Sequence, residues 1–407
     1  MSATPHPIRV LLAQREFLGL WFVGGMSMTM RWLEMLATSI YVYDLSGSAL
    51  QVALMNFVRM APMLLAGSWI GAMAERHDRR RIMILGLASS AVSAAVLGVL
   101  AMTDRIELWH IALGAFIGGL HWAGDMPVRR TILGEIAGTE FVGTAMSLDA
   151  ATGNLTRVIG PLLGGALYQL VGLHGAFFAG ALIHGASLLA VLPLISRPGP
   201  HAGEGDAARP GVIASMIEGI RLSIADRALL GAMGVTLLMN MLAFPYQSMI
   251  PVIGRNDLAL DPVPIGLLVA AEGVGAFIGS VLIARYIRPT GYMRLYVFSA
   301  AIVFVAALLF ALSRQFETSI MLLAVSGFGV AGFSSMQSAL VLSLAPAHLR
   351  VRAMGSLAMC IGAQPLGIIY IGMLAEALGT PGAIIAMEIQ GLIAMAILVW
   401  ALPPLRR

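Results

Sequence analysis

Long apolar stretches separated by short polar segments occur along the whole chain. A helix that crosses a bilayer needs about 20 mostly apolar residues, because the hydrocarbon core is about 30 Å thick and each residue rises about 1.5 Å. Windows of that length predict twelve spans, at residues 17–43, 49–73, 82–103, 107–128, 142–170, 175–196, 228–252, 263–285, 292–313, 318–344, 351–378 and 382–402. The pattern therefore predicts an all-α integral membrane protein with twelve transmembrane helices.

One connection between the predicted spans is much longer than the others. It occupies residues 197–227 and contains the turn-forming sequences Arg-Pro-Gly-Pro and Gly-Glu-Gly-Asp. Its second part, residues 212–227, has the length of a helix that could lie along the membrane surface. We therefore expect an N-terminal six-helix half at 1–196, a cytoplasmic linker at 197–227 and a C-terminal six-helix half at 228–407.

The two predicted halves resemble each other at small residues. At an offset of 207 or 208, the matches pair Gly67, Gly71, Ala145, Met146, Gly165, Gly172, Gly175 and Ala176 with Gly275, Gly279, Ala353, Met354, Gly372, Gly379, Gly382 and Ala383. Several matches in the same order indicate duplication into pseudo-symmetric halves. Transporters built from such repeats hold their substrate between the repeats near the bilayer midplane. The glycine pairs also have a simpler role, since small residues let membrane helices approach closely.

The small number of charged residues, and their types, exclude several classes of protein. Only 11% of the 407 residues are charged and 58% are hydrophobic, whereas a soluble domain has about 25% charged residues. All 25 basic residues are arginine, which excludes a Walker A loop and a Schiff-base lysine. The single cysteine excludes an internal disulfide and a cysteine-cluster metal site.

The distribution of arginine predicts the orientation. With the N-terminus inside, nineteen arginines fall on cytoplasmic segments, three on outer loops and three inside spans. Cytoplasmic loops of membrane proteins carry such an excess, so we expect both termini in the cytoplasm of a multi-pass protein of the cell inner membrane. The same bias explains the net charge of +4 without a nucleic-acid partner. The first span follows a polar lead with no cleavage site after it, so we interpret it as a retained helix.

The loop after the second span carries a dense charge motif, Gly71-Ala-Met-Ala-Glu75-Arg76-His77-Asp78-Arg79-Arg80-Arg81. It resembles the signature loop of the major facilitator superfamily, and the segment Asp44-Leu-Ser-Gly-Ser48 resembles the branch that contains enterobactin and macrolide exporters. Glu75 stands where an aspartate is usual, Asp78 where a glycine is usual, and the second-half copy at 279–294 lacks the acid.

The resemblance implies a conformational latch in this loop. Glu75 would sit against the N-terminus of the eleventh span, where the helix dipole favours an anion, and Arg79 or Arg80 would pair with Asp125. The residues assigned to this latch are Gly71, Glu75, Arg76, Asp78, Arg79, Arg80 and Asp125. The alternative is a set of arginines that only sets topology.

The fifth span contains a second motif, Gly160-Pro161-Leu-Leu-Gly164-Gly165. It resembles the Gly-Pro-x-x-Gly-Gly motif of proton-coupled exporters, which implies antiport and favours export over import. Pro161 would let the helix bend, and the glycines would admit a neighbouring helix. Ordinary tight packing is the alternative.

Ionisable side chains inside predicted spans are functional candidates, because each costs about 2.5–3.5 kcal/mol to insert. Glu34, Glu272 and Asp149 are the candidate proton carriers, since a carboxyl in a water-poor site can exchange a proton near neutral pH. Glu34 lies one turn from Arg31 and could pair with it, and Asp149 could pair with Arg157. For each, a structural ion pair is the competing interpretation.

Other polar residues could line a substrate cavity. The full set of cavity candidates is Arg31, Arg59, Asn154, Arg157, Asn240, Gln247, Gln337, Gln364 and Tyr370. His121, His174 and His184 have no partner at ligand spacing, so we expect no metal site and no cofactor.

These observations predict a secondary transporter. We expect a proton-coupled exporter, or antiporter, of small amphipathic molecules such as drugs or siderophores, acting as a monomer by alternating access. A lipid or lysophospholipid translocator, or a metabolite importer of the same fold, is the alternative. An enzyme is not expected, because the longest segment outside the spans has only about thirty residues and no His-Glu-x-x-His or Ser/His/Asp arrangement is present.

Overall fold

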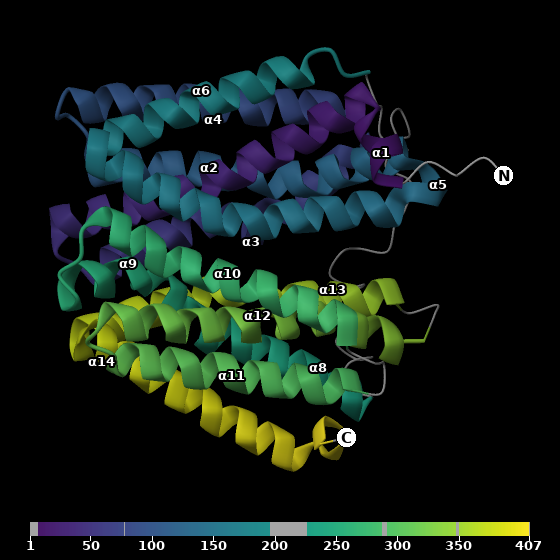
Figure 1. Ribbon diagram of the computed structural model, residues 1–407, viewed down its shortest axis with the longest axis vertical. Helices are drawn as coiled ribbons and strands as arrows, with labels where there is room; N and C mark the ends of the chain where they lie inside the picture. The colour runs from purple at the N-terminus through teal and green to yellow at the C-terminus, as the bar shows by residue number, and fades with distance from the viewer. Residues whose placement is uncertain (1–6, 77, 196–225, 287–290, 347–349, 407) are drawn as a thin grey trace. The chain divides into compact units, whose positions relative to one another are not determined.

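The structure is a computed structural model that describes residues 7–76, 78–195, 226–286, 291–346 and 350–406. Within these ranges, the side chains of residues 7, 64–76, 139, 284, 286 and 350–352 are not described. Every element in the described part of the chain is helical (Figure 1). The sequence-based prediction of an all-α protein is therefore confirmed.

The described residues of the first half form six helical elements. They are α1 (Pro7–Leu12), α2 (Arg15–Ser46), α3 (Ala49–Arg76), α4 (Arg79–Met102), α5 (Leu108–Val171) and α6 (Leu173–Val191). The 64 residues of α5 include a kink at Gly138, where φ is 67° and ψ is 175°. Because this backbone conformation belongs almost only to glycine, Gly138 separates the fourth and fifth predicted spans.

The second half begins with an irregular helical stretch. Its order is α8 (Arg227–Leu238), η1 (Met239–Ala243), η2 (Phe244–Met249), α9 (Ile250–Val252) and η3 (Ile253–Asp257). Pro245 and Pro251 lie in this stretch, and proline removes a backbone donor from the helical ladder. The seventh predicted span is thus one continuous but locally rewound helix.

The remaining elements are regular. They are α10 (Pro262–Tyr286), α11 (Tyr292–Leu312), α12 (Phe316–Leu344), α13 (Arg350–Ile361), α14 (Gln364–Ala401) and η6 (Pro403–Arg406). A kink at Gly379 inside α14 divides the eleventh span from the twelfth. Helices thus cover all twelve predicted spans. In the described residues, seven helical stretches are long and apolar enough to cross a membrane by length and composition alone.

The predicted internal repeat is visible in backbone conformation. Gly172 and Gly379, which the sequence matched, have φ of 86° and 72° and ψ of −173° and 161°. The next matched pair also agrees, since an added Cβ on Gly175 would meet Val171 and one on Gly382 would meet Leu378. Corresponding helices therefore end and restart in the same way.

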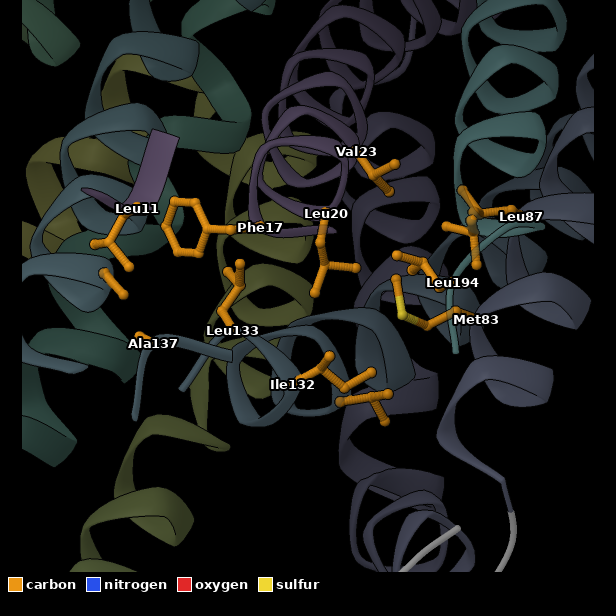
Figure 2. Close-up of a cluster of buried hydrophobic side chains, with 13 residues drawn as sticks. Leu11, Phe17, Leu20, Val23, Met83, Leu87, Ile132, Leu133, Ala137 and Leu194 are labelled. Atoms are coloured by element: carbon orange, nitrogen blue, oxygen red, sulfur yellow. The ribbon is translucent and has the colours of Figure 1, made fainter. Parts of the chain in front are cut away.

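The chain divides into two compact units. The first comprises residues 1–41 and 58–206, and the second comprises residues 42–57 and 207–407. In the first unit a buried apolar cluster joins α1, α2, α4, α5 and the segment after α6; Figure 2 shows Leu11, Phe17, Leu20, Met83, Ile132 and Leu194 converging in it. This cluster fixes one end of the helices that carry the candidate site.

In the second unit, α12 packs directly against α10. The carbonyl oxygen of Ala324 lies where a Cβ on Gly275 would stand, and the carbonyl oxygen of Glu272 lies where one on Gly327 would stand. Gly279 likewise faces Phe328 and Ala331. The predicted close-packing role of Gly275 and Gly279 is confirmed, because any larger side chain would force the helices apart.

Candidate functional site

A cavity of about 50 Å³, lined by both apolar and ionisable side chains, lies inside the first unit, among α2 to α6. Its charged or titratable lining side chains are Arg31, Glu34, Arg59, His121 and His184. The site candidates Arg31, Glu34 and Arg59 are thus brought together, whereas Asn154 and Arg157 do not line this cavity. A drug-sized ligand occupies about 300–1,000 Å³, so the cavity suits water or a small group.

Glu34 is paired with Arg59 on the next helix. The distance from Arg59 Nη1 to Glu34 Oε2 is 3.7 Å, and both side chains are largely buried. Thr38 bridges the two helices, because its hydroxyl donates to the Glu34 carbonyl and accepts from Arg59 Nη2. The pair is loose for a charge-assisted contact, whose usual length is about 2.7–2.9 Å.

The expected pairing of Glu34 with Arg31 is wrong. The Arg31 guanidinium instead lies 3.6 Å from the centre of the Trp122 ring and 5.8 Å from that of Trp32. A cation over the face of an aromatic ring is stabilised by about 0.5–2 kcal/mol. Helical spacing places Arg31 and Glu34 on one face of α2, but the Arg31 guanidinium lies over the ring of Trp122 from α5 instead.

Glycines on the facing helices make room for this cluster. An added Cβ on Gly180 in α6 would lie 2.7 Å from Glu34 Oε1, and one on Gly119 in α5 would meet the Arg59 carbonyl oxygen. A third glycine, Gly86 in α4, accommodates His121, whose Nδ1 would be 2.6 Å from its Cβ. Gly180 and Gly119 thus let α6 approach α2 and α5 approach α3, and Gly86 lets α4 approach the His121 side chain of α5.

The two histidines form a pair that the sequence reasoning missed. The rings of His121 and His184 meet edge to face with centroids 5.6 Å apart. Their separation of 63 positions gives no local spacing signal. In the described part of the chain, no group of three His, Cys, Asp or Glu residues is placed to hold a metal ion.

A denser ion cluster lies beside the cavity. Arg129 is fully buried and donates to Asp149 and, at 3.1 Å, to Asp125, while Arg130 Nε donates to Asp149 at 2.8 Å. Asp149 is therefore bound by these two arginines rather than by Arg157, the partner expected from spacing. Gly24 in α2 faces the Arg129 guanidinium, where a side chain would collide with it.

The predicted latch contacts of Arg79 and Arg80 are wrong. Arg79 pairs with Glu135 and Arg80 donates to the Leu192 carbonyl oxygen. Asp125 instead forms an ion pair with Arg129. The two residues are four positions apart in α5 and therefore lie on the same face of the helix. Asp78 caps the N-terminus of α4 by accepting from the Arg80 amide at 3.0 Å.

The remaining latch residues lie where side chains are not described. They are Gly71, Glu75 and Arg76.

The motif of the fifth span packs directly on α2. An added Cβ on Gly160 would lie 2.9 Å from the Thr29 carbonyl oxygen, and one on Gly164 would lie 2.8 Å from that of Leu33. Pro161 and Gly165 are buried beside them. Arg157, one turn earlier, lies 5.3 Å from the centre of the Trp32 ring. The motif therefore presses the fifth span against the helix that carries Arg31 and Glu34.

In the second unit, Glu272 is buried and accepts a hydrogen bond from Gln247. Asn240 donates a hydrogen bond to the carbonyl oxygen of Thr236 at 2.9 Å, and Gln337 donates one to the Thr236 hydroxyl at 3.4 Å. Tyr370 donates to Gln390 at 3.1 Å, and Gln364 begins α14. These candidates therefore form several separate contacts within the unit.

Glu388 is a buried carboxyl that the sequence reasoning missed. Its side chain in α14 is fully buried, and neither oxygen has a hydrogen-bond partner among the described residues. The signal was present, because Glu388 is an acid within the twelfth predicted span.

The chain was compared with known families and proteins. The sequence profile described as transmembrane secretion effector matches residues 9–406. The multidrug efflux pump Tap of Mycolicibacterium fortuitum is 28% identical over 89% of each chain. The staphyloferrin A transporter of Staphylococcus aureus is 23% identical over 68% of this chain and 69% of its own. Macrolide efflux protein A of Streptococcus pyogenes is 22% identical over 89% of this chain and 90% of its own.

The fold is also found among solved structures. A bacterial homologue of the human lysosomal transporter Spinster, crystallised in an inward-facing and unoccupied conformation, superposes with a TM-score of 0.73. It is 14% identical and the match covers 99% of this chain and 98% of that one. At this identity the likeness shows the fold alone.

Proposed function

This chain belongs to the transmembrane secretion effector family of the major facilitator superfamily, and on that premise we propose that it exports small amphipathic molecules in exchange for protons. The family identifies a multi-pass membrane transporter rather than an enzyme. The family resemblance inferred from the charged loop is confirmed. Drug-like compounds and siderophores are the proposed cargoes, by analogy with relatives named as a multidrug efflux pump, a macrolide efflux protein and a staphyloferrin A transporter.

The Glu34–Arg59 ion pair carries the proposal of proton coupling. Two opposite charges in a largely buried site stabilise each other, and removing one leaves the other unpaired at a cost of several kcal/mol. A proton that binds the Glu34 carboxylate neutralises it and releases Arg59. Because Glu34 belongs to α2 and Arg59 to α3, protonation changes the contact between these helices. Such a change can bias alternating access.

Glu272 is the second proposed carrier, since it is a buried carboxylate held by the neutral amide of Gln247. Asp149 is less suited to the role. Its two arginine partners stabilise the ionised form, which favours the structural interpretation. The proposed proton carriers are therefore one carboxylate in each unit, Glu34 in the first and Glu272 in the second.

Export is proposed from relatives named as efflux proteins and from the resemblance of the fifth-span motif to that of exporters, and this motif packs on α2. Gly160 and Gly164 face the backbone of the turn between Thr29 and Leu33, directly beside Arg31 and Glu34. A bend at Pro161 would therefore move the helix that carries the proposed proton carrier.

The experiment uses purified protein in proteoliposomes, with ethidium and a macrolide as probes. An inward-directed proton gradient should drive probe out of the wild-type interior, and collapsing the gradient should stop it. Glu34→Gln should reduce gradient-driven transport by at least about tenfold while retaining probe-for-probe exchange, because only the titrating group is lost.

Glu317→Gln serves as the matched control, since Glu317 is an exposed carboxyl in the first turn of α12. It should behave as wild type. Gradient-driven transport by Glu34→Gln at the wild-type rate would remove Glu34 from the mechanism. Transport of labelled lysophospholipid but of neither probe would overturn the cargo class.

A further inference from the structure

Four buried polar side chains that line the cavity of the first unit each carry an atom without a hydrogen-bond partner in the described part of the chain. Among the described residues, His121 Nε2, His184 Nδ1 and the hydroxyls of Ser27 and Ser90 have no hydrogen-bond partner. All four line the same cavity and are more than nine-tenths buried. A buried polar group without a partner costs about 1–3 kcal/mol, so this arrangement needs an occupant that donates and accepts hydrogen bonds.

The size of the cavity identifies that occupant as water. One water needs about 10–15 Å³ of such space, and the cavity measures about 50 Å³. It therefore has room for several water molecules. Water bridges otherwise unsatisfied buried groups and can pass protons between them.

The titratable groups are arranged in sequence around this cavity. Asp125 lies one turn from His121 on α5 and has an oxygen, Oδ1, without a described partner. His121 contacts His184 edge to face. Glu34 packs against Gly180 on α6, one turn before His184. Residues four apart on a helix are neighbours on its surface, so the order is Asp125, His121, His184 and Glu34.

The charges facing the histidine pair come from α2, α3 and α5. Arg31 and Glu34 lie on α2, Arg59 on α3, and Asp125 and Arg129 on α5. The described α4 residues that line the cavity are neutral, and α6 contributes His184 itself. The pair thus lies between two carboxylates that both face arginines.

We propose that His121 and His184, with water held by Ser27 and Ser90, form a proton relay that delivers protons to and from Glu34. In each step a protonated water transfers its proton to the free nitrogen of a neutral imidazole. The imidazolium then releases a proton through the next water to the Glu34 carboxylate, and the ring is neutral again. One proton moves and no other bond changes.

This relay rests on the proposed coupling role of Glu34, but it can be tested without any cargo. Infrared difference spectroscopy of the protein in lipid nanodiscs, after a rapid pH jump, follows protonation of buried carboxyls. Glu34→Gln assigns the band. We expect His121→Gln and His184→Gln to slow protonation of Glu34 by about tenfold or more.

Two further variants separate a relay from a structural role. In the His184→Ala variant, protonation of Glu34 should be slow. Imidazole added to the buffer should restore the rate of protonation, because a free imidazole can replace the missing ring. Ser90→Ala is a smaller change. It should slow protonation of Glu34 by a lesser factor, and the variant protein should have the melting temperature of the wild type. His174→Gln, a histidine outside the cavity near the start of α6, is the control and should leave the rate unchanged.

Wild-type protonation kinetics of Glu34 in both histidine variants would overturn the relay. Slow kinetics that imidazole does not restore would also overturn it and indicate a structural role. If Glu34 titrates through the histidines but no probe moves under a proton gradient, the proposed function fails while the relay stands.

Discussion

Arg129 is a buried cation that pairs with two carboxylates. Its side chain is fully buried and bound by Asp125 and Asp149, which lie before and after the Gly138 kink. Burying a guanidinium without a partner would cost several kcal/mol. The two carboxylates therefore fix how the fourth span meets the fifth. The ion pair of Glu34 and Arg59 is looser than those of Arg129, because its two atoms are 3.7 Å apart. This distance leaves room for a proton to reach the Glu34 carboxylate.

Asp149→Asn should therefore destabilise the protein strongly. It leaves Arg129 with one carboxylate and Arg130 with none at this site, so we expect a loss of about 3–5 kcal/mol. Thermal unfolding in detergent, followed by circular dichroism, measures the change. Glu317→Gln is the comparison, since Glu317 is an exposed carboxyl in the first turn of α12 and exposed charges contribute below about 1 kcal/mol. Equal melting temperatures for the two variants would contradict this assignment.

Among the elements, α2 organises the first unit. Glycines on the helices beside it, at Gly160, Gly164 and Gly180, contact its backbone or its Glu34 side chain. Membrane helices gain little from apolar contact alone, so close backbone packing through small residues supplies the association. The ionisable cluster is held in place because α5 and α6 can reach α2 at these positions.

Gly160→Ala should disturb this contact. The added methyl group would lie 2.9 Å from the Thr29 carbonyl oxygen, and backbone cannot move aside as a flexible side chain can. We expect a loss of about 1–3 kcal/mol in stability and a several-fold fall in gradient-driven transport. Gly153→Ala is the matched control on the same helix, because its methyl group would meet only the flexible Met28 side chain at 3.4 Å. A Gly160→Ala protein as stable and active as Gly153→Ala would show that the contact is unimportant.

At the scale of the whole molecule, topology depends on where the arginines lie. Nineteen of the 25 fall on segments that would be cytoplasmic with the N-terminus inside, and positive segments resist translocation. Helical segments occupy the ranges of the twelve spans on which this count depends. The expected topology therefore has both termini in the cytoplasm.

The single cysteine makes this orientation simple to test. In a Cys360→Ser background, Thr103→Cys places a thiol in the exposed turn after α4, and Glu140→Cys places one in the exposed segment of α5 just after the Gly138 kink. A membrane-impermeant maleimide applied to intact cells should label the first and not the second. Permeabilised cells should show labelling of both. The reverse pattern in intact cells would place the N-terminus outside.

The sequence allowed more of the fold than of the site to be predicted. Span length and arginine bias act locally, so each could be interpreted one segment at a time. The repeat could be found because Gly172 and Gly379 need a backbone conformation that only glycine readily adopts. Pairings between helices were predicted less well. Glu34 was assigned to Arg31 and Asp125 to the loop arginines, whereas Arg59 and Arg129 bind them.

The sequence by itself determined that the chain is an all-helical membrane protein with twelve spans, because the bilayer imposes length and apolarity on each helix separately. It also named most of the intramembrane charges. Only the tertiary structure decided which of them meet. His121 and His184 are 63 residues apart, and no local rule joins them. Glycines on α5 and α6 set how closely those helices approach α2 and α3, Gly86 on α4 makes room for His121, and these distances decide which side chains share the cavity.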